Sequence, residues 1–317
     1  MATETVAQGA RSQLLFKKQT ALGTQATGNF TKARFNTHGL KAQIESAESE
    51  EIRSDREVYD FRHAHRHAMG PSVHELVYGD HDGFVESAMF STFSAAVTDD
   101  DGLIQIGVAP QYFSLEDGAV DIVQYRMFVD MLVSRAQFQF RTGREAIVRM
   151  SLDWVGTGGG TPAGSSSGGT AVAPSTNSPF DTFTGTMFDN AQESGDELLI
   201  ISSLDINIDN GANPIFALTQ QTGIGLEYGR GRITGQLTAF YKDAALLNRH
   251  LNETEWTLVM DLVDPDGNTM EFRLPRIKST DGDVPVANER SRLITMSFQA
   301  LKDDTYGSAL RITKITV

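Results

Sequence analysis

The sequence predicts a mainly β protein made of two tandem domains, each a β-sandwich or barrel with one short flanking α-helix. Runs of β-branched and aromatic residues, separated by Gly, Asp and Asn, recur along both halves of the 317-residue chain. An uncharged segment rich in Gly and Ser lies between the halves. Similar segments also occur in the same order before and after it. These three observations together predict a duplicated β unit.

The clearest predicted boundary is the segment 156–179, which carries no charge and is rich in Gly, Ser, Thr and Pro. This composition is typical of a flexible linker, with an r.m.s. span of roughly 27 Å if each residue contributes as in a Gly/Ser coil. We therefore divide the chain into a flexible N-terminal arm (1–12), a first domain (13–155), the Gly/Ser-rich linker, and a second domain (180–317).

Several runs predict strands. Residues 136–141, 232–241 and 256–263 combine β-branched and aromatic residues. The Asp-Pro-Asp-Gly-Asn turn at 264–268 leads into a further run at 269–274, which is a strong signal for a β-hairpin.

One short helix is predicted in each half, directly after a strand. The first covers residues 80–93 and the second residues 243–251, with Asp243 suited to cap its start. Three apolar residues share one face of the first helix: Phe84, Ala88 and Met89.

Two pairs of segments indicate an internal duplication. Residues 67–80, before the first predicted helix, resemble residues 231–243, before the second. Residues 146–155 resemble residues 292–301 toward the end of each half. Because both resemblances occur in the same order, they are stronger evidence together than either is alone.

The composition excludes several classes of function. The net charge of −14 disfavours binding that depends on attraction to the phosphate backbone of DNA. The absence of cysteine excludes disulfides, iron–sulfur centres, thiolate zinc sites and cysteine nucleophiles. No apolar stretch approaches the ~18 residues of a membrane helix, and no signal peptide pattern is present. We expect a protein that is soluble when made, with no membrane partner.

A cluster of histidines is the one candidate for metal binding. On a strand, His63, His65 and His67 point to one face, a spacing that could hold a metal through imidazole. The competing interpretation is a row of exposed strand positions, because Arg62 and Arg66 oppose cation binding. The sequence favours this second interpretation, and we predict no metal site.

The acidic segment 45–60 is a candidate subunit interface. It alternates in charge and contains too few apolar residues to fold alone, so we expect an extended arm or hairpin ordered by contacts with neighbouring subunits. The candidate interface residues are Glu48, Glu50, Glu51, Arg53, Asp55 and Arg56.

Motifs for catalysis are absent from the sequence. We find no glycine-rich nucleotide-binding loop, no nucleophile elbow and no zinc-protease motif, and nothing selects a pair among the many carboxylates. We therefore predict no catalytic residue, no cofactor and no enzymatic activity.

An ordered set of segments resembles a known family, the major tail tube proteins of long-tailed, siphovirus-like bacteriophages. Each segment alone is weak, but the set occurs in the family's order across residues 12–155 and 180–317. The segments are 50–56, 62–69, 231–247, 264–268, 274–278 and 298–301.

The resemblance implies a structural protein of the virion tail, made in the host cytoplasm. Two packed β-sheets with a flanking helix would form a tail-tube-type unit, and sheets of neighbouring units would join into a continuous lumen wall. By resemblance to duplicated tail tube proteins, a chain with two units would form a trimeric, pseudo-hexameric ring. The implied partners are further copies of the chain, the tape measure and tail terminator proteins, and DNA that passes through the lumen during ejection without specific binding.

Two other functions stay open at this stage. One is a two-domain β-sandwich surface or receptor-binding module, which would remain a soluble oligomer. The other is a β-sandwich hydrolase acting on polysaccharide, which usually requires aromatic platforms for sugars. The only two tryptophans, Trp154 and Trp256, lie in apparent core strands.

Overall fold

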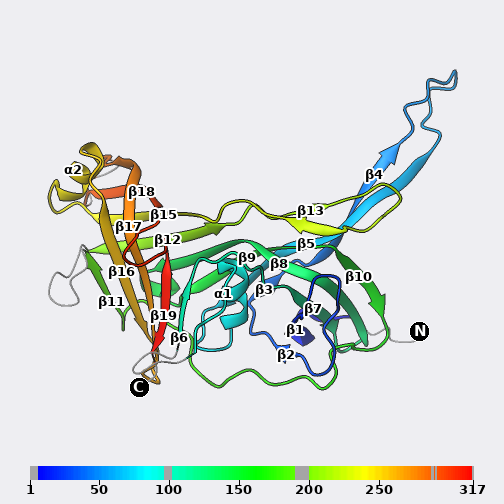
Figure 1. Cartoon of the computed structure of the whole chain (residues 1–317), viewed down its shortest axis with the longest axis horizontal. Helices are drawn as coiled ribbons and strands as arrows, with labels where there is room; N and C mark the ends of the chain where they lie inside the picture. Colours follow the sequence, from blue (N-terminus) through cyan, green and yellow to red (C-terminus); the bar gives the residue numbers. More distant parts are fainter. Residues whose placement is uncertain (1–5, 96–101, 190–199, 287–288, 290, 316–317) are drawn as a thin grey trace.

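The computed structural model describes residues 6–95, 102–189, 200–286, 289 and 291–315 (Figure 1). In these residues the chain forms mainly β-strands, as the sequence predicted, together with two short α-helices. The mainly β class is therefore confirmed.

The first half contains the two 3-10 turns and most of the strands. These elements are η1 (Gly9–Arg11), β1 (Ser12–Lys18), β2 (Thr31–Lys32), β3 (Thr37–His38), β4 (Lys41–Glu48), β5 (Phe61–Glu75), α1 (Asp82–Met89), β6 (Gly102–Gln105), β7 (Phe113–Ala119), β8 (Gln124–Arg141), η2 (Gly143–Glu145), β9 (Arg149–Gly156) and β10 (Gly158–Ala163).

The second half contains the remaining elements. They are β11 (Thr186–Asp189), β12 (Ile201–Asp209), β13 (Asn213–Ile215), β14 (Gly225–Glu227), β15 (Arg232–Phe240), α2 (Ala245–Leu251), β16 (Trp256–Val263), β17 (Thr269–Asp283), β18 (Leu293–Ala300) and β19 (Arg311–Ile315).

One antiparallel sheet runs through both halves of the chain (Figure 1). In the first half, β3 and β4 pair with β5, β5 with β9, and β9 with the C-terminal part of β8. In the second half, β12 pairs with β15, β15 with β18, and β18 with the C-terminal part of β17. Strand β8 also pairs with β12, so the sheet is continuous between the halves. The order of pairing is the same in each half.

A second layer lies against this shared sheet in each half. The N-terminal part of β8 pairs with β7 and β10, and β7 pairs with β1. The N-terminal part of β17 pairs with β16 and β19, and β16 pairs with β11. The long strands β8 and β17 therefore pass from one layer to the other.

The core lies between these layers, and the alternation along β8 explains why. Phe138 and Phe140 are buried, whereas Gln137 and Gln139 are half-buried on the opposite face. Phe138 and Phe140 lie 5.1 and 5.6 Å from the ring of Phe272 on β17, so one hydrophobic core extends through both halves.

Each helix follows the strand that the sequence predicted. Helix α1 is shorter than the expected 80–93, because Phe90 adopts a left-handed conformation with φ of 50° and ends it. The three residues predicted for its apolar face are buried: Phe84, Ala88 and Met89. At the start of α2, the Asp243 carboxylate accepts a hydrogen bond from the Ala245 N–H at 2.8 Å.

The segment 156–179 differs from the flexible coil expected of it. Its first part forms β10, which pairs with β8. Further along, the Phe30 N–H donates to the Gly168 carbonyl at 2.9 Å, and the Val172 N–H donates to the Phe30 carbonyl at 2.8 Å. A Cβ on Gly168 would lie 2.9 Å from the Leu15 side chain, so glycine allows this close approach. Hydrogen bonds to backbone groups and to side chains such as the Glu116 carboxylate hold the segment against the first half.

The expected start of the second domain also lies against the first half. Phe180 is fully buried, and its N–H donates to the Leu76 carbonyl at 2.9 Å. Its own carbonyl accepts from the Val148 N–H at 3.0 Å.

Candidate assembly surfaces

The pairing of β8 with β12 is an edge-to-edge junction between the two halves. Its register runs without a shift, from Ser203 opposite Arg141 to Asp209 opposite Arg135. Arg141 donates to the Asp205 carboxylate at 2.8 Å, and Arg135 donates to that of Asp209 at 3.0 Å. Such partly exposed ion pairs contribute at most ~1 kcal/mol each. The backbone ladder and the burial of apolar residues therefore hold this junction.

A second connection joins the halves in the other layer, where β19 pairs with β6. Lys314 on β19 is almost buried, and its Nζ lies 2.5 Å from the Asp82 carboxylate at the start of α1. The same Nζ lies 5.2 and 4.7 Å from the ring centroids of Tyr78 and Phe93. Burial raises the pKa of Asp82, and the charge of Lys314 opposes that shift. This contact ties the last described strand to the first half.

Two strand edges lie at the ends of the shared sheet. In the part of the chain that the structure describes, β3 and β4 pair with a strand, β5, on one side only. Likewise, residues 278–283 of β17 pair only with β18. Such edges present backbone donors and acceptors to another chain.

The acidic segment 45–60 forms most of an arm that projects from the body as the extended hairpin of β4 and β5 (Figure 1). Arg53 contacts Asp55 at 3.3 Å and Glu51 at 3.7 Å, and its guanidinium lies 4.1 Å from the Tyr59 ring centroid. The predicted interface residues are all exposed on this arm: Glu48, Glu50, Glu51, Arg53, Asp55 and Arg56. Their contact with another copy stays a prediction.

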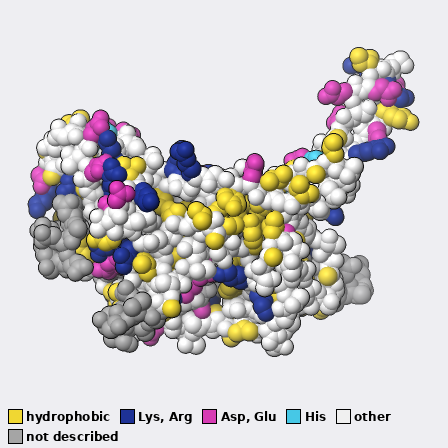
Figure 2. All heavy atoms as spheres, in the orientation of Figure 1, with side chains coloured by type: hydrophobic (Ala, Val, Ile, Leu, Met, Phe, Trp, Pro, Cys, Tyr) yellow, Lys and Arg dark blue, Asp and Glu magenta, His cyan; other side chains and the backbone are white. Residues whose placement is uncertain are grey.

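Apolar side chains accompany the charges on this arm. Ile52 is 97% exposed, and Val58, Tyr59 and Phe61 are also exposed. Figure 2 shows hydrophobic and charged side chains mixed along the projecting hairpin. Within the described chain the arm thus presents a surface that a partner could cover.

The second half carries a hairpin at the matching point, between β12 and β15, but this one lies across the first half (Figure 1). The Arg66 N–H donates to the Gln221 carbonyl at 2.7 Å. The ring of Phe216 stacks on His65 with centroids 4.5 Å apart. Tyr228 contacts Phe90 edge-on at 4.9 Å. The hairpin of one unit therefore covers its neighbour.

The histidine cluster shows no arrangement for metal binding. Among the described residues, no group of His, Asp and Glu side chains could hold a metal ion. His65 instead stacks on Phe216, and His63 contacts Phe61 edge-on. Burial lowers the pKa of His67.

Two other histidines are buried beside α1 and share one acceptor. The Nδ1 of His74 and the Nε2 of His81 lie 2.8 and 3.2 Å from the Arg34 carbonyl. The Trp154 indole donates to the Ser72 hydroxyl, which lies 2.8 Å from the Nε2 of His74. Burial lowers the pKa of His74 to about 3 and also lowers that of His81. Both rings are therefore neutral structural groups near pH 7.

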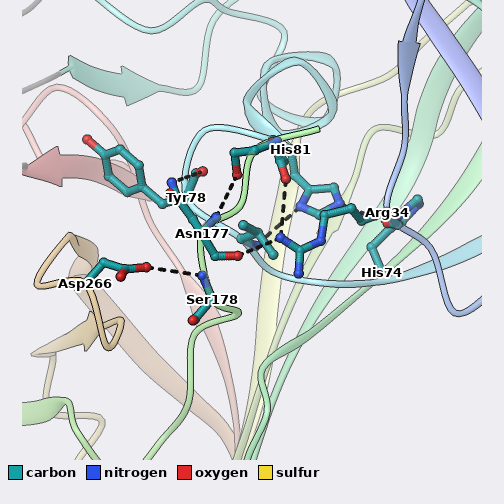
Figure 3. Close-up of polar contacts among 10 residues, drawn as sticks. Arg34, His74, Tyr78, His81, Asn177, Ser178 and Asp266 are labelled. Carbon is teal, nitrogen blue, oxygen red and sulfur yellow. Dashed lines mark hydrogen bonds and ion pairs between the residues drawn. The ribbon is translucent and has the colours of Figure 1, made fainter. Parts of the chain in front are cut away.

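The same region holds the end of the connecting segment (Figure 3). Arg34 donates to the Asn177 carbonyl at 2.6 Å, and the Asn177 amide donates to the Tyr78 carbonyl at 3.3 Å. The next N–H, of Ser178, donates to the Asp266 carboxylate at 3.3 Å. This segment is thus fixed between the first half and the turn 264–268 of the second.

The face of the shared sheet that points away from the core is polar. Amide and hydroxyl side chains occupy much of it, alternating along each strand with buried residues. The residues concerned are Gln137, Gln139, Ser151, Asn207, Thr234, Gln236, Ser297 and Gln299. The carboxylates of Asp205 and Asp209 on this face are paired with arginines.

These surfaces define a β protein in which two similarly paired units join through the edges of their sheets. A family model for phage tail tube proteins matches residues 9–300, and the chain belongs to that family. No curated protein was found to match the sequence. The family's role is structural, in the virion tail, and the family is not known as enzymatic. No helix in the described ranges is long and apolar enough to cross a membrane.

Sequence reasoning missed both connections between the halves. Lys314 and Asp82 lie 232 positions apart, and neither belongs to a recognisable motif. The sequence gives one indication that β8 has further partners. The run around 124–141 is longer than a strand that belongs to a single layer. The identity of the strand that pairs with β8 at this junction depends on tertiary packing, which the sequence pattern does not show.

Proposed function

We propose that the protein is the major tail tube subunit of a siphovirus-like bacteriophage and that it polymerises into stacked rings. Each chain contributes two tandem tail tube domains, so three chains form a ring of pseudo-sixfold symmetry. The observation that carries this proposal is the β8–β12 junction, through which one unit extends the sheet of the other. Repeating such a junction between chains closes the sheet into a ring without disulfides and leaves no free edge.

The polar face of the shared sheet becomes the wall of the lumen through which DNA is ejected. Its amides, hydroxyls and arginine-paired carboxylates present little net charge to phosphate, which favours passage of DNA without retention. The tape measure and tail terminator proteins are the further partners proposed.

Exposed apolar side chains support contacts with additional copies beyond the ring. Leu218 is 92% exposed on the hairpin between β13 and β14, and Ile215 and Ile224 are also exposed there. Figure 2 shows hydrophobic side chains on the face that it draws, across the middle of the molecule and toward the base of the projecting arm. We assign this patch to stacking between rings.

Negative-stain electron microscopy of the concentrated, purified protein tests the proposal. We expect hollow tubes of constant diameter with a regular axial repeat. A sample that contains only discrete soluble oligomers at every concentration contradicts it and supports a surface or receptor-binding module instead.

A further inference from the structure

We propose that residues 37–41 of one copy pair antiparallel with residues 278–283 of another, and that the arm of the first copy lies over the second half of the other. This inference rests on the proposed assembly into rings. It takes the junction inside the chain as the template for the junction between chains, because both sets of strands occupy matching places in the two halves.

The register of the first half can be followed straight across the sheet. His38 on β3 lies opposite Ser72 on β5, and Ser72 lies opposite Leu152 on β9. Leu152 lies opposite Ala136 on β8. The row then crosses the internal junction, where Ala136 lies opposite Ile208 on β12.

The second half contains a matching row. Ile206 on β12 lies opposite Gly235 on β15, and Gly235 lies opposite Phe298 on β18. Phe298 lies opposite Ser279 on β17. The described sheet ends there, at an edge of β17. This edge corresponds to the edge of β8 that pairs with β12.

The two rows fix the register of the missing pair. His38 begins the first row and Ile206 begins the second. Across the internal junction the first row continues at Ile208, two residues after Ile206. Ser279 ends the second row as Ala136 ends the first row within the first half. Ala136 faces Ile208, two residues after Ile206. Ser279 should therefore face the residue two positions after His38 in another copy, which is Leu40.

The side chains face the directions that this register requires. Leu40 is buried in the core, and the Ser279 hydroxyl points to the core side, 2.8 Å from the Met296 sulfur. Strand β17 has a bulge at residue 280, because Ser279 lies opposite Phe298 and Asp281 lies opposite Ser297 on β18. With this bulge kept in the proposed pair, Thr37 lies opposite Asp283, and both side chains are exposed. In the proposed pair, residues that face the core therefore lie opposite residues that face the core, and exposed residues lie opposite exposed ones.

The arm follows from the same template. The hairpin of the second half leaves the sheet after β12 and covers the neighbouring unit within the chain. The arm leaves the sheet after β4, at the matching point, and its neighbouring unit is the second half of another copy. That unit would cover the exposed side chains of Ile52, Tyr59 and Phe61.

The junction between copies lacks the ion pairs of the internal one. Where the internal junction places Asp209 opposite Arg135, the template places Lys41 opposite Lys278, whose ammonium lies 2.6 Å from the Glu253 carboxylate and is therefore partly neutralised. Like charges in facing positions oppose association, so we expect the junction between copies to be the weaker one. Added salt should screen this repulsion and promote assembly.

Engineered disulfides test the register, because the chain contains no cysteine. In the double variant Thr37→Cys/Asp283→Cys, oxidation of assembled tubes should give covalent dimers and trimers on a non-reducing gel, with the closed trimer as the largest product. A mixture of the two single variants should give dimers only. The control pair Lys41→Cys/Asp283→Cys lies about 13 Å apart in this register, too far for a disulfide.

The outcomes separate this inference from the proposed function. Tubes that form from the double variant but give no cross-link, or control tubes that cross-link equally well, overturn the register while the tube function stands. A wild-type protein that forms no tubes overturns the proposed function and the inference with it. If the double variant alone fails to assemble, cross-linking between the two mixed single variants decides the register.

Discussion

At the scale of single residues, the buried histidines make the first half sensitive to acid. His74 is neutral when folded, with a pKa of about 3 against 6.5 for an unperturbed histidine. Between these values the unfolded chain binds the proton and the folded chain does not, so unfolding becomes easier as the pH falls. The contribution of the neutral ring is complete above pH 6.5 and is lost progressively toward pH 3.

We predict that this effect lowers the free energy of unfolding by about 2–3 kcal/mol between pH 7 and pH 4.5. Urea denaturation followed by tryptophan fluorescence measures it, since Trp154 donates to the hydroxyl beside His74. The variant His74→Gln should be less stable at pH 7 but lose the share of the pH dependence that His74 contributes, while His81, whose pKa burial also lowers, keeps its own share. The control His63→Gln, at an exposed position, should keep it. An unchanged slope in His74→Gln contradicts this account.

At the scale of elements, local patterns predicted what local physics determines. The apolar face of α1 and the turn before 269–274 depend on neighbours in sequence, so both were visible without the structure. The segment 156–179 was not, because its order comes from backbone hydrogen bonds to Phe30 and from side chains such as Arg34 far away in sequence. Composition indicates how much apolar surface a segment can bury, but it does not indicate such hydrogen bonds. The arm was predictable because most residues of the segment 45–60 are charged or polar.

The arm gives the prediction that belongs to this scale. Because few of its backbone groups are shielded by the body of the described chain, we expect amide hydrogens of residues 45–60 to exchange fast in the monomer and slowly in tubes. Residues 136–139 of β8, paired on both sides, should be protected in both states and serve as the control. Equal exchange of the arm in monomer and tube contradicts its role as an interface.

At the scale of the whole molecule, the proposed lumen wall must let DNA pass through every ring. Placing lysine on this wall, as in Gln137→Lys or Gln236→Lys, adds a weak attraction that repeats along the tube. We predict that tubes still form, because single surface charges change stability little, while DNA passage slows at low salt and recovers at high salt.

The control for this effect is the same charge placed elsewhere. Ser165→Lys lies on the exposed part of the connecting segment, away from the shared sheet, and should leave DNA passage unchanged. If the lysines at 137 and 236 leave ejection unaffected even at low salt, the polar face of the shared sheet is not the lumen wall.

The central claim is that one chain supplies two of six equivalent positions in a ring whose sheet is continuous. A cryo-electron microscopy map of assembled tubes tests it most directly. We predict three copies per ring, with β17 of each copy hydrogen-bonded to the β3–β4 edge of the next and the polar face of the sheet toward the channel. Six copies per ring, or three copies whose sheets remain separate, would contradict the account.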